Sequence, residues 1–488
     1  MPTGSPMTQS TANQTSKNKL VKASFGYTIG NYLLKGIAFI SVPIFARLLS
    51  KEDFGIYNTF IAYESIAFVI IGLAIHSSYK NAYLKYKDNP PNRNFRTYVS
   101  SSMVLIVLSF LGWVLIANIF GSKLIEWLSL SRIELNLLLI FSCSTAIISC
   151  YNSDVGIYYD YKGFLKLSAF NALANIGFSI ILICTVFDGM RYMGRIVGTV
   201  IPAAIAALYV ILRNYQKAKP ENYKEFWKWG VGYSLPIVPH GISQVLLSQF
   251  DRIMIMQMIG AAEAGVYSFA FTINLIIFVT ANSLETVWLQ WFYEKMNKKD
   301  IDGMKKYNIY FVAGIALFTC LLILVAPELI YILGGEKYQD AIYCTIPVII
   351  GGYFTFLYKL PAAVEYYHEK TSSIAIATIM AAIVNVVLNL IFIPKYGYIA
   401  AAYTTVFAYM LYFLFHCIMS KKIQGKFIFS VSWIIFAVLA VASVSLFTYQ
   451  NINNLIIRLA VAFTIFCIAI VYEEKNFCLI KKYILKKK

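Results

Sequence analysis

The first long apolar segment carries a polar stripe that ends in a lysine. Ser24, Thr28, Asn31 and Lys35 recur at helical spacing, so they share one face of a helix. Lys35 lies about 12 residues from either end of the segment, or roughly 18 Å at about 1.5 Å per residue. A lysine side chain cannot reach the membrane interface over that distance. Lys35 therefore needs a water-filled cavity or an acidic partner, and in a cavity its ammonium group would bind an anion.

An acidic residue, Glu64, lies at a similar depth in the next apolar segment, which would run in the opposite direction. One interpretation is a structural ion pair between Lys35 and Glu64. In the other, Lys35 meets an anionic substrate, and Glu64 accepts a coupling ion. The two interpretations can coexist, and the sequence leaves both open.

Glycine and proline interrupt the seventh apolar segment. Pro236 and Pro239 each remove a backbone hydrogen bond and bend a helix. A polar stripe with helical spacing follows them: His240, Gln244, Ser248 and Asp251. This pattern indicates a moving helix that lines a cavity, with the two prolines as its hinge. An ordinary proline kink packed among neighbouring helices is the alternative.

Further charged residues lie inside or near the ends of other apolar segments. Lys359 stands near Pro361 in the tenth segment, where it would either bind an anionic substrate or extend to the interface. Several acids could accept a coupling proton or sodium ion, or else be solvated helix ends: Glu64, Asp154, Asp251, Glu285 and Glu365.

The sequence contains none of the common enzyme motifs. GxSxG, the Walker A motif and HExxH are all absent, and the eight cysteines show no spacing typical of metal ligands. We therefore expect no catalytic residues, no metal and no cofactor. Transport would be passive or coupled to H⁺ or Na⁺.

The composition is that of an integral membrane protein. Of the 488 residues 59% are hydrophobic and only 14% are charged, against about 25% charged residues in soluble domains. Apolar blocks of roughly 20 residues recur, the length that a helix needs to cross a bilayer. We predict an all-α membrane protein with about fourteen transmembrane helices, at residues 23–46, 56–79, 98–120, 134–157, 165–187, 194–213, 229–250, 264–288, 308–333, 342–366, 372–393, 399–419, 428–447 and 455–472.

Lysine and arginine set the predicted orientation. With the N-terminus inside, the cytoplasmic segments hold about three times as many of them as the outer segments. Both termini are therefore predicted to be cytoplasmic. This asymmetry also explains the net charge of +18 without a nucleic-acid partner.

An internal repeat divides the spans. The loop at residues 48–57 resembles that at 258–267, and Asn175 and Asn385 are again 210 residues apart. A unit of six spans is even, which indicates parallel repeats of the kind found in transporters. We predict a disordered tail at 1–22, six-helix lobes at 23–215 and 216–420, and two extra helices with a basic tail at 421–488.

Two segments carry a family resemblance. Residues 43–57, Pro-Ile-Phe-Ala-Arg-Leu-Leu-Ser-Lys-Glu-Asp-Phe-Gly-Ile-Tyr, are similar to the first-loop signature of the Wzx-type oligosaccharide-lipid flippases of O-antigen and capsule synthesis. These proteins belong to the multidrug/oligosaccharidyl-lipid/polysaccharide exporter superfamily. Residues 389–405 resemble a second pattern of that superfamily, with Ala400 in place of its second glycine.

The resemblance implies a V-shaped, two-lobed transporter in the bacterial cytoplasmic (inner) membrane. It would move an undecaprenyl-diphosphate-linked oligosaccharide across the bilayer by alternating access. Its partners would be this substrate, membrane lipids, and a polysaccharide polymerase with its chain-length machinery. The diphosphate and sugar would lie in a cationic cavity lined by Lys35, Lys359, Arg252, Asn31, His240 and Gln244.

Two other functions remain as alternatives. An ion-coupled multidrug antiporter of the same superfamily would need an acidic, apolar cavity, whereas Lys35 is the most central charge in this sequence. A membrane-embedded polysaccharide polymerase or glycosyltransferase usually carries a large outer loop, and the outer loops predicted for this chain are short.

Overall fold

The computed structural model describes residues 9–468, and the regular structure within that range is helical throughout. Twelve of the helices in this range are long and apolar enough to cross a membrane. The prediction of an all-helical multi-pass membrane protein is therefore confirmed. By its contacts the chain divides into two compact units, Met1–Ile253 and Met254–Lys488.

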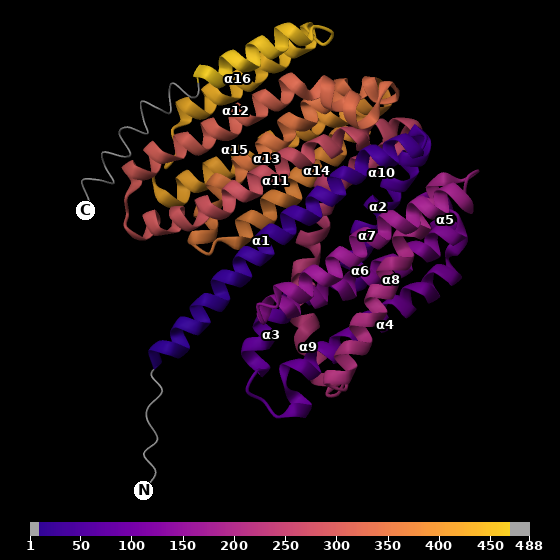
Figure 1. Cartoon of the computed structure of the whole chain (residues 1–488). Helices are drawn as coiled ribbons and strands as arrows, with labels where there is room; N and C mark the ends of the chain where they lie inside the picture. Colours follow the sequence, from indigo (N-terminus) through magenta and orange to yellow (C-terminus); the bar gives the residue numbers. More distant parts are fainter. Residues whose placement is uncertain (1–8, 469–488) are drawn as a thin grey trace. The chain divides into compact units, whose positions relative to one another are not determined.

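Unit 1 contains the helices that precede the middle of the chain, coloured indigo to magenta in Figure 1. In chain order they are α1 (Gln9–Leu48), α2 (Lys51–Gly72), η1 (Ile75–Ser78), α3 (Tyr79–Tyr86), η2 (Pro91–Arg93), α4 (Phe95–Ile119), α5 (Gly121–Leu128), α6 (Arg132–Ile157), α7 (Tyr161–Thr185), α8 (Arg191–Lys217), α9 (Tyr223–Ser234), η3 (Leu235–Ile237) and the greater part of α10 (Val238–Met258).

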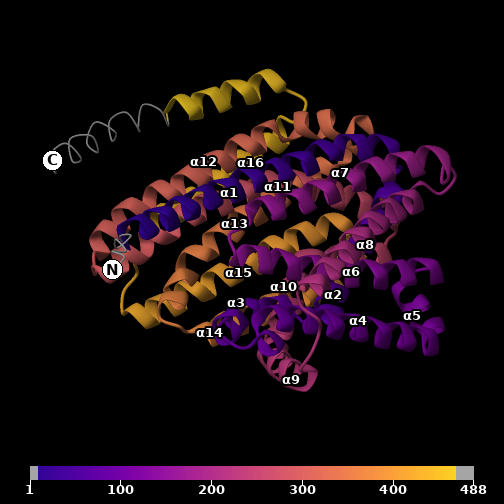
Figure 2. The same cartoon turned by 60° about the horizontal axis from the view of Figure 1, so that its bottom comes forward.

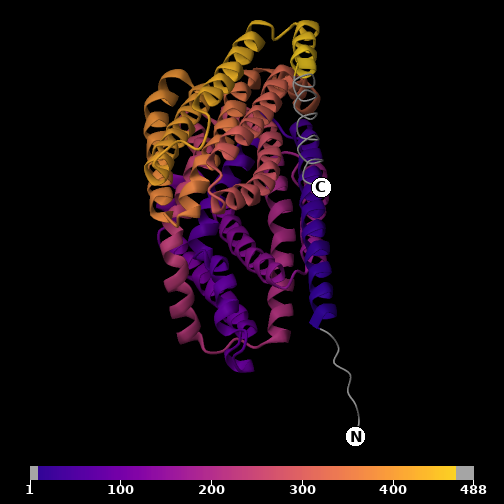
Figure 3. The same ribbon diagram turned by 90° about the vertical axis from the view of Figure 1, so that its left-hand side faces the viewer.

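Unit 2 contains the remaining helices. They are α11 (Ala261–Asn297), α12 (Ile301–Gly334), η4 (Glu336–Ala341), α13 (Ile342–Tyr367), α14 (Thr371–Tyr396), α15 (Tyr398–Gln424) and α16 (Val431–Gln450). A shorter apolar helix, Leu455–Ile468, follows α16. The two form the yellow hairpin in Figure 3.

The first and the seventh predicted spans differ from the structure. The first helix begins at Gln9, although its apolar part begins only at Gly26. The predicted span at 229–250 is divided between α9, η3 and α10, and none of these three passes as a continuous apolar span. The last predicted span, 455–472, begins as expected at Leu455, and its final residues lie outside the described range.

The internal repeat appears in the helix bounds. Helices α11, α13 and α14 begin 210 residues after α2, α6 and α7 respectively. The packing repeats as well: α6 contacts α2, α4 and α8 in unit 1, and α13 contacts α11, α12 and α15 in unit 2. Figure 2 shows α13 among these partners. Each unit is therefore built around one central helix that is the counterpart of the other.

Small residues allow the closest helix contacts. A Cβ atom added at Gly198 of α8 would lie only 2.5 Å from the Cα atom of Ser179 on α7. Glycine at this position lets the two backbones touch, which is a common way of packing helices in lipid. The α7–α8 contact in turn fixes the polar side chains that both helices carry.

Candidate functional site

Lys359 of α13 forms an ion pair inside unit 2. Its ammonium group donates to Asn282 Oδ1 at 2.7 Å and lies 2.5 Å from Glu285 Oε2, both on α11. The lysine side chain is only 18% exposed. The packing of α11 against α13 thus brings together two charges that the sequence placed separately, a candidate substrate cation and a candidate ion-coupling acid.

A second acidic candidate, Glu365, lies further along α13 and is fully buried. One carboxylate oxygen is 2.5 Å from Nδ1 of His416 on α15, and the hydroxyl of Ser373 on α14 donates to the other. Both side chains of the Glu365–His416 pair are 0% exposed. Glu365 is therefore not a solvated helix end.

Aromatic rings close this pair off from its surroundings. The Tyr358 ring stacks on the His416 imidazole at 5.8 Å, and the Tyr412 ring meets it edge-on at 4.6 Å. Tyr358 directly precedes Lys359 on α13, and Glu365 follows on the same helix, so the Lys359–Glu285 and Glu365–His416 pairs both involve α13. Sequence reasoning missed His416, because a lone histidine in an apolar helix, 51 residues from its acidic partner, gives no local signal.

In unit 1 the acidic candidates Asp154 and Glu64 are buried and hydrogen-bonded. Arg96 of α4 donates to both carboxylate oxygens of Asp154, at 2.9 and 2.8 Å, and its guanidinium lies over the Tyr158 ring. Asp154 is therefore buried rather than solvated. Glu64 is buried on α2 and accepts a hydrogen bond from Thr145 of α6 at 2.5 Å.

The polar stripe of the first span lies on an exposed helix. Asn31 and Lys35 are both exposed on α1, which packs mainly along α7. Lys35 belongs to unit 1 and Lys359 to unit 2. The side chain of Ser24 lies outside the described residues.

The remaining candidates lie around the interrupted seventh span. Pro236 stands in the 3₁₀ turn η3 and Pro239 in the first turn of α10, so the helix is broken where the sequence predicts a bend. His240 and Gln244 follow on α10 and are half-buried. The end of this helix carries the two charged candidates, the buried Asp251 and the half-buried Arg252, which donates to Gln249.

Two arginines near the ends of predicted spans, Arg195 and Arg458, are structural. Arg195 of α8 is 8% exposed, donates to Asn175 and Ser179 of α7, and lies 3.7 Å from the Phe45 ring centre. Arg458 is 1% exposed and pairs with Glu328 of α12.

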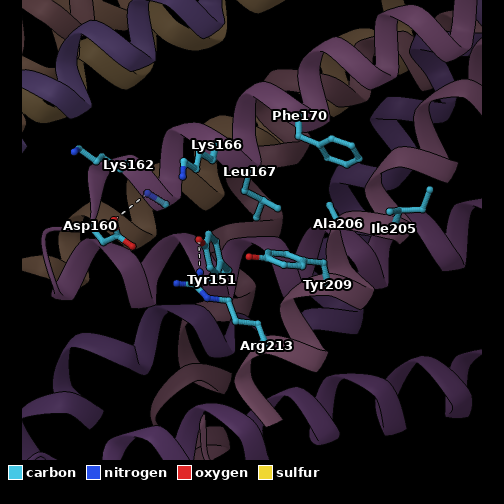
Figure 4. A pocket seen from close by; sticks show the side chains of 11 residues that line it. Tyr151, Asp160, Lys162, Lys166, Leu167, Phe170, Ile205, Ala206, Tyr209 and Arg213 are labelled. Carbon is cyan, nitrogen blue, oxygen red and sulfur yellow. Dashed lines mark hydrogen bonds between the residues drawn. The ribbon is translucent and has the colours of Figure 1, made fainter. Parts of the chain in front are cut away.

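A cavity of about 520 Å³ opens where α6 ends, α7 begins and α8 ends. Its polar end is lined by Lys162, Lys166 and Arg213, together with one acid, Asp160 (Figure 4). The Arg213 guanidinium donates to the Tyr151 hydroxyl at 2.5 Å. These bases lie at or just outside the ends of the predicted spans 165–187 and 194–213, and their spacing does not indicate a common cavity.

Two relatives each cover at least three quarters of the chain. A protein of the Lsg locus of Haemophilus influenzae is 21% identical over 387 residues, which cover 75% of this chain and 90% of that protein. An uncharacterized membrane protein of Methanocaldococcus jannaschii is 22% identical over 423 residues, 81% of this chain and 96% of that protein.

Solved structures show the fold. The lipid II flippase MurJ, in an inward closed conformation, matches with a TM-score of 0.72 and 16% identity, over 92% of this chain and 99% of that chain. An inward-facing multidrug resistance transporter of the MATE family in the MOP superfamily matches with a TM-score of 0.57 and 16% identity, over 80% of this chain and 95% of that chain. The similar structures are flippases and transporters, not enzymes.

The family follows from the sequence profile. Residues 20–296, more than half of the chain, match the family described as "Polysaccharide biosynthesis protein". This match shows that the chain belongs to the polysaccharide biosynthesis protein family.

Proposed function

We propose that this protein is a flippase that moves an undecaprenyl-diphosphate-linked oligosaccharide across the bacterial cytoplasmic membrane, for the synthesis of O-antigen or capsule. The observation that carries the proposal is that a member of the polysaccharide biosynthesis protein family shares the fold of the lipid II flippase MurJ over 92% of its chain. Both termini would be cytoplasmic, on the side with most lysines and arginines.

The charged residues of the spans suit a diphosphate substrate. A diphosphate cannot enter hydrocarbon without cationic partners, because burying an unpaired charge is very costly. Lys35 is an exposed cation on the first span. Lys359 is held by Glu285, and competition between a substrate phosphate and this carboxylate would let the lysine bind and release its cargo.

The buried Glu365–His416 pair supports coupling to protons rather than to sodium. A carboxylate and an imidazole 2.5 Å apart can hold one proton between them. Sodium would require several oxygen ligands, whereas within residues 9–468 the Glu365 carboxylate meets one imidazole and one hydroxyl. We therefore assign Glu365 as the coupling acid, with His416 as its partner.

The test uses a strain that lacks both the chromosomal copy and the polysaccharide polymerase, so that single lipid-linked units accumulate. A glycosidase added outside spheroplasts cleaves only units that have crossed the membrane. We expect cleavage when the wild-type protein is supplied, none with Lys35→Ala, and recovery with Lys35→Arg. Lys219→Ala, an exposed lysine between helices, is the matched control and should behave as wild type.

Persistent cleavage without the gene would contradict the proposed flippase function. Cleavage that persists in the strain without any copy of the gene would show that another protein moves the unit. If that strain also became sensitive to cationic drugs, a multidrug antiporter would be the better description. Normal cleavage with Lys35→Ala would remove Lys35 from the mechanism while leaving the flippase function intact.

A further inference from the structure

The α6–α7–α8 cavity of unit 1 carries unneutralised positive charge. Within residues 9–468, the ammonium groups of Lys162 and Lys166 have neither an ion-pair nor a hydrogen-bond partner. The third base, Arg213, has a hydrogen bond to a neutral tyrosine and keeps further donors free. The single acid of the lining, Asp160, already accepts from the Gly163 amide at the start of α7. The cavity therefore attracts an anion.

Each wall of the cavity changes from basic to apolar in the same direction. Along α7, Lys162 and Lys166 are followed one turn later by Phe170. Along the antiparallel α8, Arg213 is preceded by Tyr209 and then by Ile205 (Figure 4). Eight residues separate the two ends of each wall, or about 12 Å at 1.5 Å per residue. The ligand must therefore be anionic at one end and apolar about 12 Å away.

The apolar walls continue onto the surface of both helices. Phe170 and Ile205 are 45% and 49% exposed, and Leu173 and Leu208 beside them are exposed as well. In a span, such side chains face lipid tails rather than water. A soluble sugar phosphate or nucleotide would gain nothing from this half of the cavity, whereas a phospholipid presents both a phosphate and acyl chains.

We propose that this cavity binds an anionic phospholipid of the leaflet at the basic end of the helices. The headgroup phosphate lies between Lys162, Lys166 and Arg213, and an acyl chain runs along Phe170 and Ile205. Basic pockets between transmembrane helices are known to suit such headgroups. The bound lipid bridges α7 to α8 and holds the junction after α6 in place. It is a resident of the membrane and not the transported substrate.

The experiment uses the full-length protein purified in neutral detergent. Phosphatidylglycerol is added, and lipid retention is followed by native mass spectrometry and stability by the melting temperature. We expect phosphatidylglycerol, but not phosphatidylcholine, to be retained and to raise the melting temperature. The variant Lys162→Gln/Lys166→Gln should bind phosphatidylglycerol roughly 30-fold more weakly, about fivefold for each lysine removed.

The control removes the same charge elsewhere. Lys224→Gln/Lys228→Gln changes two exposed lysines of α9 that do not line the cavity, and it should bind as wild type. Equal weakening by both double variants would mean diffuse attraction to a basic surface and would overturn the site. A second variant, Arg213→Gln, should weaken binding independently of the lysines.

A third measurement distinguishes a resident phospholipid from the transported lipid diphosphate as the ligand of the cavity. A short-chain polyprenyl diphosphate is added in place of phosphatidylglycerol. If it binds the wild type and is lost in Lys162→Gln/Lys166→Gln while phosphatidylglycerol binds neither protein, the cavity serves the substrate and our assignment is wrong. Retention of phosphatidylglycerol with normal flipping by the lysine variant would support a resident lipid.

Discussion

The buried Glu365–His416 pair allows a sharp test, because two substitutions of Glu365 separate its charge from its hydrogen bonds. Glu365 accepts from Ser373, and the same hydroxyl donates to the Lys370 carbonyl. In Glu365→Gln the amide oxygen can still accept from His416, and the amide nitrogen can donate to the Ser373 hydroxyl. Both hydrogen bonds survive, and only the negative charge is lost.

The expected magnitudes differ accordingly. Glu365→Ala leaves the buried His416 imidazole without its carboxylate partner, whereas the Ser373 hydroxyl keeps its bond to the Lys370 carbonyl. Since both side chains of the Glu365–His416 pair are 0% exposed, the free energy of unfolding should fall by about 3–5 kcal/mol. In Glu365→Gln the free energy of unfolding should fall by less than about 1.5 kcal/mol, which is the net contribution of one ordinary hydrogen bond.

The assay combines unfolding with transport. Stability is measured by thermal unfolding of the purified protein, and flipping by glycosidase access as above, at several pH values. If Glu365 couples protons, Glu365→Gln folds almost normally yet loses the pH dependence of flipping. If it is only structural, flipping falls in proportion to stability. An alanine variant that melts like the wild type would refute the buried pair itself.

Three further outcomes follow from the packing. Glu285→Gln leaves the mostly buried Lys359 ammonium without its counter-ion, so the free energy of unfolding should fall by about 1–3 kcal/mol. In a double-mutant cycle, adding Lys359→Met should restore part of this stability. Gly198→Val places side-chain atoms against the backbone of α7 and should lower the free energy of unfolding by at least about 1–3 kcal/mol. A lower yield and a lower melting temperature would show this. In the loop before α12, a hydrogen bond from Lys295 holds the pKa of Asp300 below its usual value. The folded pKa is thus below the unfolded one, so the contribution of Asp300 is present above about pH 4 and lost as pH falls through the folded value. The difference in melting temperature between wild type and Asp300→Asn should shrink at low pH.

Much of the fold could be predicted because its signals are local. Apolar length reveals a span without knowledge of its neighbours. The repeat was visible from residues such as Asn175 and Asn385, and the structure shows why both persist: each side chain hydrogen-bonds across the equivalent pair of helices, to Arg195 in unit 1 and to Thr405 in unit 2.

The pairing of charges could not be predicted in the same way. Arg458 finds Glu328 at a sequence separation of 130 residues, and Asp154 finds Arg96 at 58. Its place near the end of the predicted span 455–472 suggests that Arg458 is solvated, although its guanidinium is buried against backbone carbonyls. Partners of this kind depend on which helices become neighbours, and hydropathy carries no such information.

The repeated design has a consequence for how the chain could be made. Each ion pair described above joins residues of a single unit, and each unit is centred on its own helix, α6 or α13. Two polypeptides produced from separate genes, one ending at Ile259 and the other beginning at Gly260, would therefore each carry the contacts needed to fold. Restored flipping in cells that express both fragments would mean that the covalent link between them serves mainly to keep their numbers equal.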